Sequence, residues 1–311
     1  PEMSISCIKE LDQAGMPDEN EDVFVLDGAL FCDANLERVC RYHEETAADI
    51  TLLACRSGDP TAGCMLQCDA RGKVQKLIDC PSWEQVCSDV LSMGICVMKG
   101  RVLRGMRHMR TLSDMLDKAL MEGMQIQSFF AGGYWNPIAD TDGYMKCIFD
   151  LLREDINIAS PLVSEKKKMP ECQADRAGVK ITPPCYISTQ AVLHKGAQIG
   201  PFTVITGRSE VGSGSYVDRC LVRNAQIGED CSVFGAVIDE RAKIGDGAGL
   251  SEGTIVGMGA QVGDGAVVYE DVKIGPFKKV QPGAHLHFDL TDCRKNASDF
   301  EVDNGRILVD F

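Results

Sequence analysis

The residue types that could bind a metal ion are cysteine, histidine and carboxylate, and their spacing argues against such a site. The 15 cysteines are an odd number spread along the chain. No pair has the spacing of a zinc or redox motif, and Cys64 and Cys68 come closest. His285 and His287 have no evident third ligand, which favours a surface strand. We therefore expect small buried thiols and no resident metal.

Composition excludes several partners. The net charge of −14 disfavours binding to a phosphate backbone, and the run Lys166 to Lys168 is interpreted as a solvated face. No apolar run approaches the length of a membrane span, and the residues from Pro1 to Ser4 do not begin an export signal. We expect a cytoplasmic protein without nucleic-acid or membrane partners.

Aliphatic residues recur at nearly every sixth position in the last third of the chain. Glycine often follows them, as at Gly212 and Gly263, and small residues often lie two positions before them. Three of the steps have five residues. The repeating positions are Ile187, Leu193, Ile199, Ile205, Val211, Val217, Val222, Ile227, Val233, Ile238, Ile244, Leu250, Val256, Val262, Val268, Ile274 and Val280.

A six-residue period predicts a left-handed parallel β-helix of hexapeptide repeats, in which the aliphatic side chains point inward. Five coils or slightly more would form, and His285 and His287 would lie past the last coil. A β-sandwich would instead show a period of two. Gly-x-Gly pairs such as Gly245/Gly247 lack the third glycine of a dinucleotide loop, so they are interpreted as corner residues.

The N-terminal half alternates helical and strand patterns. Helices are expected at residues 4–14, 35–46, 112–122 and 142–152, and strands at 23–26, 50–54, 74–78, 94–98 and 126–130. This pattern predicts a Rossmann-like mixed α/β sheet, mostly parallel. The predicted domains are 1–157 (α/β, incomplete at its start), 158–184 (linker) and 185–311 (β-helix with a tail). The start looks truncated because no first strand or glycine-rich loop precedes the opening helix.

Four stretches together resemble the bacterial glucose-1-phosphate adenylyltransferase family. They are the strand and loop from Val23 to Leu30 with the residues that follow it, the segment Ser92-Met-Gly-Ile95, the segment Gly133-Tyr-Trp135, and the hexapeptide repeats. The resemblance implies an α/β nucleotidyltransferase-like domain and a role in ADP-glucose and glycogen synthesis. Members couple a nucleoside triphosphate to a sugar 1-phosphate, which requires metal ions and cationic side chains to neutralise charge.

Three positions depart from the pattern of that family. Ala29 stands where the family has a metal-binding Asp, Cys80 where it has a phosphate-binding Lys, and Pro137 where it has a second metal-binding Asp. Asp27 and Asp140 are candidate substitutes. Because all three changes remove charge, the resemblance is to the non-catalytic, regulatory type of subunit, a pseudoenzyme.

A residual sugar-phosphate pocket is predicted at Ser92, Met93, Gly94, Tyr134 and Trp135, with core packing as the competing interpretation. The expected partners are other copies of the chain or a catalytic paralogue, with a sugar phosphate or nucleotide as effector. An active nucleotidyltransferase that makes ADP-glucose or another nucleotide sugar, with Mg²⁺ bound, is the alternative. A hexapeptide acyltransferase that uses His194 as a general base is a third hypothesis, which the α/β domain disfavours.

Overall fold

The computed structural model describes residues 17–26, 28–105, 109, 111–153, 178–291, 301–303 and 306–308. These residues fall into two compact units, Pro1–Ala139 and Asp140–Phe311. The predicted helix at 4–14 and most of the predicted linker lie outside the described residues. The predicted domain limits therefore stay predictions.

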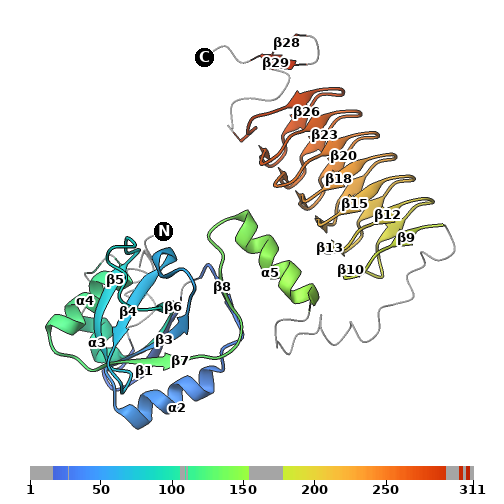
Figure 1. Ribbon diagram of the computed structural model, residues 1–311. Coiled ribbons are helices and arrows are strands. Elements are labelled where there is room, and N and C mark those ends of the chain that lie inside the picture. Colours follow the sequence, from blue (N-terminus) through green and yellow to red (C-terminus); the bar gives the residue numbers. More distant parts are fainter. Residues whose placement is uncertain are drawn as a thin grey trace. The chain divides into compact units, whose positions relative to one another are not determined.

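The first unit is a mixed α/β fold (Figure 1). Its strands are β1 (Asp22–Leu26), β2 (Leu30–Cys32), β3 (Ile50–Arg56), β4 (Cys64–Cys68), β5 (Val74–Asp79), β6 (Val90–Lys99), β7 (Ile126–Phe130) and β8 (Trp135–Pro137). Its helices are α2 (Leu36–Thr46), η1 (Pro60–Ala62), α3 (Gly100–Gly105) and α4 (Leu112–Met121). The expected strands and helices that fall on described residues are present, with limits shifted by a few residues.

The main sheet has the order β5-β4-β6-β3-β7, and β1 pairs with β6. Among the described strands of this sheet, only β3 and β7 run parallel. Strand β6 is antiparallel to β1, β3 and β4, and β4 is antiparallel to β5. The sheet is mixed as predicted, but the expectation that it is mostly parallel is wrong. The spacing of hydrophobic residues indicates where a strand lies, but it does not show whether the neighbouring strands run parallel or antiparallel to it.

Strand β3 shows how the sheet is covered on both faces. Ile50 and Leu52 belong to one buried cluster, which includes side chains from α3 and α4. Leu53 belongs to a second cluster, which includes Val39 of α2. Because successive side chains of a strand point to opposite faces, β3 contributes to both cores. Asn35 caps the N-terminus of helix α2, and its side chain accepts a hydrogen bond from the backbone N–H of Arg38.

The second unit is a left-handed parallel β-helix of about six turns, preceded by α5 (Thr141–Arg153). Strands from successive turns stack into three faces (Figure 1). The first face has β10 (Cys185–Ile187), β13 (Thr203–Thr206), β16 (Leu221–Arg223), β19 (Val237–Ile238), β22 (Ile255–Val256) and β25 (Lys273–Ile274). The second has β11 (Val192–Leu193), β14 (Glu210–Val211), β17 (Gln226–Ile227), β20 (Lys243–Ile244), β23 (Gln261–Val262) and β26 (Lys279–Val280). The third has β9 (Lys180–Ile181), β12 (Gln198–Ile199), β15 (Tyr216–Asp218), β18 (Ser232–Phe234), β21 (Gly249–Leu250), β24 (Val267–Val268) and β27 (His285–Leu286), extended by β28 (Glu301–Asp303) and β29 (Arg306–Leu308).

The predicted inward positions form the core of the β-helix. All of them are buried except Leu193, which is partly buried against the same cluster. The repeat continues one step beyond the predicted end, because Leu286 is fully buried on β27. His285 therefore lies in the last coil, and its predicted place beyond the coils is wrong.

Helix α5 packs against the first coils of its own unit. The ring of Phe149 lies 5.4 Å from that of Phe202, and the guanidinium of Arg153 lies 4.7 Å from the same ring.

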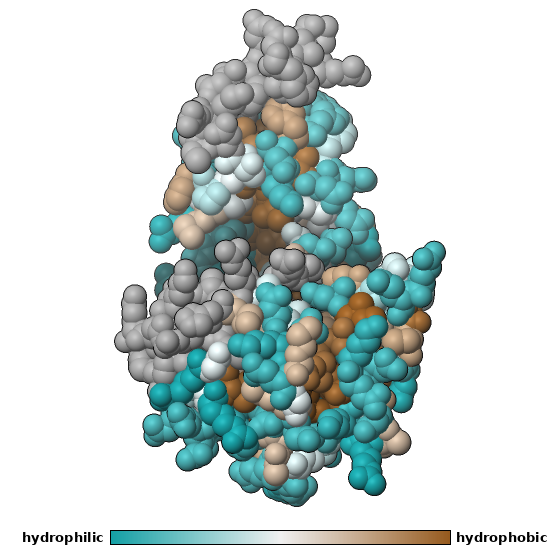
Figure 2. Space-filling view, turned by 90° about the vertical axis from the view of Figure 1, so that its left-hand side faces the viewer, coloured by the Kyte–Doolittle hydropathy of each residue, from teal (hydrophilic) through white to brown (hydrophobic). Residues whose placement is uncertain are grey.

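Hydrophilic side chains cover much of the face shown in Figure 2, and hydrophobic ones form a strip between them on the α/β unit. No helix in the described residues has the length and apolar character needed to cross a membrane.

Candidate functional site

The candidate site lies at one edge of the main sheet. Strands β3 and β7 end there and β6 begins there, since Arg56 pairs with Val90 and β7 runs parallel to β3. Strand β5 runs in the same direction as β6, because both are antiparallel to β4, and its last residue, Asp79, lies near the start of β6, since Asp79 pairs with Cys64 and the next residue of β4 pairs with Leu91. Loops that follow strand ends commonly carry binding residues in α/β folds.

A two-stranded ribbon brings two of the predicted positions together. Strands β2 and β8 are antiparallel, and Leu30 pairs with Pro137. The N–H of Ile138 donates to the carbonyl of Ala29 at 2.7 Å. Ala29 and Pro137 therefore lie beside each other, although more than one hundred residues separate them in the chain.

The side chains of Ala29 and Pro137 do not fit a bound Mg²⁺. Ala29 presents a methyl group and Pro137 a ring, and neither side chain has an oxygen that could bind a metal. The carboxylate of Asp140 accepts the backbone N–H of Gly143 at 2.8 Å at the start of α5. Asp27 lies outside the described residues. No group of three His, Cys, Asp or Glu side chains in the described part of the chain is arranged to hold a metal ion.

Cys80 follows β5 in an exposed position. Its φ of 42° is in the left-handed region, and its N–H donates to the carbonyl of Gly63 at 3.1 Å. A thiol at this place provides no ammonium group for a phosphate, unlike the lysine of the family pattern. The neighbouring Asp79 carboxylate accepts the hydroxyl of Ser113 at 3.3 Å.

The predicted sugar-phosphate pocket residues lie on β6 and at the start of β8. The indole N–H of Trp135 donates to the carbonyl of Met93 at 3.0 Å, which joins the two segments. Met93 is buried in the core on the α2 side of the sheet, and Trp135 packs against that core. Gly94 has a φ of 75°, and its N–H donates to the Ser92 hydroxyl at 3.4 Å. The ring of Tyr134 packs edge-on against Phe31, with centroids 6.1 Å apart.

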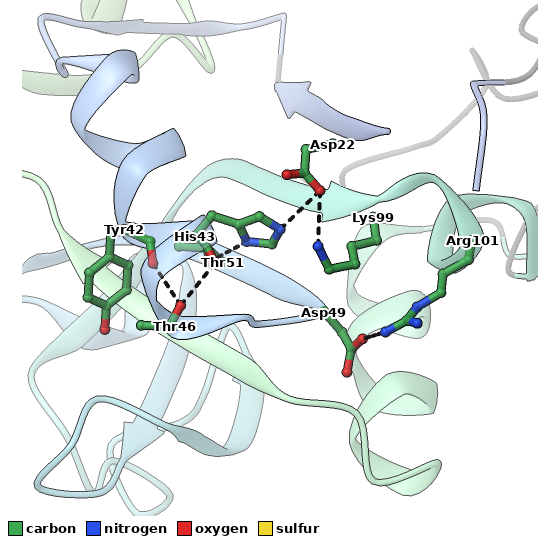
Figure 3. Close-up of polar contacts among 8 residues, drawn as sticks. All are labelled: Asp22, Tyr42, His43, Thr46, Asp49, Thr51, Lys99 and Arg101. Carbon is green, nitrogen blue, oxygen red and sulfur yellow. Dashed lines mark hydrogen bonds and ion pairs between the residues drawn. The ribbon is translucent and has the colours of Figure 1, made fainter. Parts of the chain in front are cut away.

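A second polar cluster lies at the opposite end of β6 (Figure 3). The buried ring of His43 places Nδ1 2.7 Å from the Thr51 hydroxyl and Nε2 3.4 Å from the Asp22 carboxylate. Lys99 contacts the same carboxylate at 3.4 Å. Burial lowers the pKa of His43 below its usual value, and Asp22 partly offsets this effect. The cluster ties α2 to the sheet, away from the candidate site.

The second carboxylate in that cluster is Asp49. Burial opposes its ionisation, but the backbone N–H of Gln125 and the guanidinium of Arg101 lower its pKa. The Gln125 N–H lies 2.9 Å from Asp49 Oδ2, and Arg101 bonds to Oδ1. These contacts tie the start of β3 to α3 and β7, so Asp49 has a structural role.

The remaining sequence candidates have structural partners. His194 Nε2 lies 2.7 Å from Glu210 Oε1 on an exposed face of the β-helix. His287 stacks on Tyr269 with centroids 3.6 Å apart, and the Tyr269 hydroxyl lies 3.2 Å from His285 Nδ1. Burial raises the pKa of Cys64 to about 12, although this residue is only partly buried. Cys80 and Cys87 are exposed, so the expectation of buried thiols is wrong for these two residues.

Comparison with known proteins agrees with this architecture. Residues 7–154 match the family model described as "Nucleotidyl transferase", and residues 181–286 match the one described as "GMPPB C-terminal domain". The fold and these matches define the class: a nucleotidyltransferase domain followed by a left-handed β-helix. They support a place in the sugar-nucleotidyltransferase family and do not single out its ADP-glucose members.

The chain is also similar to individual proteins of this class. A probable mannose-1-phosphate guanyltransferase of Schizosaccharomyces pombe is 24% identical over 248 residues, which are 72% of this chain and 58% of that protein. A mannose-1-phosphate guanylyltransferase of Mycobacterium tuberculosis is 25% identical over 193 residues, 60% of this chain and 52% of that protein. The small subunit of a wheat glucose-1-phosphate adenylyltransferase is 20% identical over 281 residues, 72% of this chain and 58% of that protein. The chain thus spans about half the length of the relatives it matches.

Proposed function

We propose that this chain is a sugar-1-phosphate-binding member of the nucleotidyltransferase family that has lost phosphoryl transfer and acts as a regulatory partner of a catalytic paralogue. The observation that carries the proposal is the adjacency of Ala29 and Pro137. Both positions of the family pattern that would supply metal-binding carboxylates lie side by side without one. Phosphoryl transfer between two anions depends on such charge neutralisation.

The proposed ligand is a hexose 1-phosphate, with mannose 1-phosphate ahead of glucose 1-phosphate. Relatives named as mannose-1-phosphate guanylyltransferases support mannose, and the wheat relative supports glucose and an ADP-glucose role. Cys80 removes one cation from the phosphate side, so we expect binding that is weaker than in an enzyme with the lysine. The sugar would contact the first half of β6 and the segment before β8.

The experiment is a calorimetric titration of the purified chain with mannose 1-phosphate, glucose 1-phosphate and inorganic phosphate. We expect a hexose 1-phosphate to bind more tightly than phosphate alone. Addition of the chain to a catalytic paralogue is expected to change its rate or oligomeric state. No preference for a hexose 1-phosphate, together with no effect on the paralogue, would sink the proposal.

An active nucleotidyltransferase is the second candidate, supported by the names of the relatives. Release of pyrophosphate from GTP or ATP with a hexose 1-phosphate and Mg²⁺ distinguishes the two candidates. Turnover that is unchanged in Asp140→Ala but abolished in Asp27→Ala would establish an enzyme with a displaced metal ligand. The regulatory proposal expects no turnover with either triphosphate.

A further inference from the structure

The loop before β8 is held by a side chain that the sequence does not single out. Beyond the last pair of the β2–β8 ribbon, the N–H of Asp33 donates to the carbonyl of Tyr134 at 3.2 Å. The N–H of Tyr134 donates in return to Asp33 Oδ1 at 2.6 Å. In a regular antiparallel pair, the return bond would go to the backbone carbonyl of Asp33. Here the carboxylate of Asp33 takes the place of its own carbonyl.

Gly133 is adapted to the same carboxylate. Its φ of 112° is a conformation that residues with a Cβ rarely adopt. A Cβ built on Gly133 would also collide with the Asp33 carboxylate, and no other atom lies nearer to it. The Asp33 side chain therefore occupies the space that the missing Cβ leaves open. The bond from the Tyr134 N–H to the Asp33 carboxylate, at 2.6 Å, is charge-assisted, and such bonds are stronger than those between neutral groups.

The consequence reaches the two aromatic residues of the predicted pocket. The ring of Tyr134 packs against Phe31. The indole of the next residue, Trp135, donates a hydrogen bond to the carbonyl of Met93. Since both residues come directly after Gly133, the direction in which the chain leaves the turn decides where the rings lie. Without the Asp33 carboxylate, the N–H of Tyr134 would lose this partner, and one of the two hydrogen bonds between Asp33 and Tyr134 would be gone.

We infer that Asp33 is the positioning residue of the sugar side of the site: its carboxylate fixes the turn at Gly133 and thereby places Tyr134 and Trp135 for a hexose 1-phosphate. Asp33 acts through these neighbours and makes no contact with the ligand. The inference about the ligand rests on the proposed function. The inference about the position of Trp135 does not, because it concerns the free protein.

The test uses the fluorescence of Trp135. The chain has two tryptophans, and Trp83 is exposed, so Trp83→Phe leaves Trp135 as the single reporter. In that background we compare Asp33→Ala, Asp33→Asn, Gly133→Ala and, as a matched control, Glu122→Ala at an exposed carboxylate. Each variant is titrated with mannose 1-phosphate and glucose 1-phosphate, and far-UV circular dichroism checks that it folds.

Asp33→Ala and Gly133→Ala should shift the emission of Trp135 to longer wavelength and weaken hexose 1-phosphate binding about tenfold or more. Asp33→Asn, whose amide oxygen can still accept the Tyr134 N–H, should stay within about threefold of the parent, as should Glu122→Ala. Emission and affinity that are unchanged in Asp33→Ala would overturn the inference, as would an Asp33→Asn that behaves like Asp33→Ala. If the parent binds no hexose 1-phosphate, the proposed function fails, and the emission shift alone then decides the role of Asp33.

Discussion

The carbonyl of Ala29 accepts the N–H of Ile138 at 2.7 Å, so Ala29, which directly precedes β2, lies beside Pro137 of β8. In the family pattern, these two positions carry the carboxylates that hold the metal. Their adjacency shows that the two departures belong to one place in the molecule. The fold still assembles this place, although the side chains of Ala29 and Pro137 cannot ligate a metal.

The buried His43 makes the stability of the α/β unit depend on pH. Burial lowers its pKa in the folded chain, so the unfolded chain takes up a proton first when the pH falls. The contribution to the free energy of unfolding is complete above about pH 6.5, the usual pKa of histidine, and is lost toward the lowered value. One titrating group can give a slope of at most about 1.4 kcal/mol for each pH unit in this window. Asp22 and Lys99 face the same ring and act in opposite directions.

Urea unfolding at pH 7 and pH 5 measures this effect. The parent should lose more stability between the two values than His43→Gln, which keeps a polar group near Thr51 and does not titrate. Equal losses in the two proteins would show that another group controls the acid response.

Leu286 tests whether the last coil is part of the β-helix core. The side chain is fully buried, so Leu286→Ala should lower the free energy of unfolding by about 2 kcal/mol or more. Val192→Ala is the matched control, because that side chain is 51% exposed, and it should cost under about 1 kcal/mol. Thermal unfolding followed by circular dichroism measures both. A Leu286→Ala protein as stable as the control would mean that the coil contributes nothing.

Trp135→Phe removes the hydrogen bond to the Met93 carbonyl and leaves most of the ring packing. We expect a loss of about 1 kcal/mol in the free energy of unfolding. Trp83→Phe should be nearly neutral, since Trp83 is 67% exposed. Chemical denaturation of both variants checks the difference, and equal stabilities would contradict the assigned role of the indole.

The sequence predicted the β-helix well because its inward positions repeat at a constant step, from Ile187 to Val280. It predicted helices such as α2 and α4 from the helical pattern of their residues. The direction of β6 relative to its neighbours was not predictable, because direction depends on which strands meet. The short strands β2 and β8 were also missed, since three residues carry too little periodicity.

The site was predictable as single positions but not as an arrangement. Ala29, Cys80 and Pro137 stood out against a family pattern, whereas the contact between Ala29 and the residue after Pro137 required the β2–β8 pairing. The role of Asp33 could not be predicted from the sequence, because an aspartate two residues before the helix cap Asn35 is typical of an ordinary turn. Its role depends on Tyr134, about one hundred residues away.

The most direct test of the central claim is a titration with Mn²⁺, a paramagnetic substitute for Mg²⁺, followed by the indole N–H resonance of Trp135. A metal bound beside Ala29 and Pro137 would broaden this signal, because Trp135 lies two residues before Pro137 on β8. The double variant Ala29→Asp with Pro137→Asp restores the two carboxylates, and Ala29→Asn with Pro137→Asn is its uncharged control. We predict that the signal stays sharp in the parent and the control and broadens in the aspartate variant at Mn²⁺ concentrations at least tenfold lower. Broadening in the parent at the same Mn²⁺ concentration as in the aspartate variant would contradict the account.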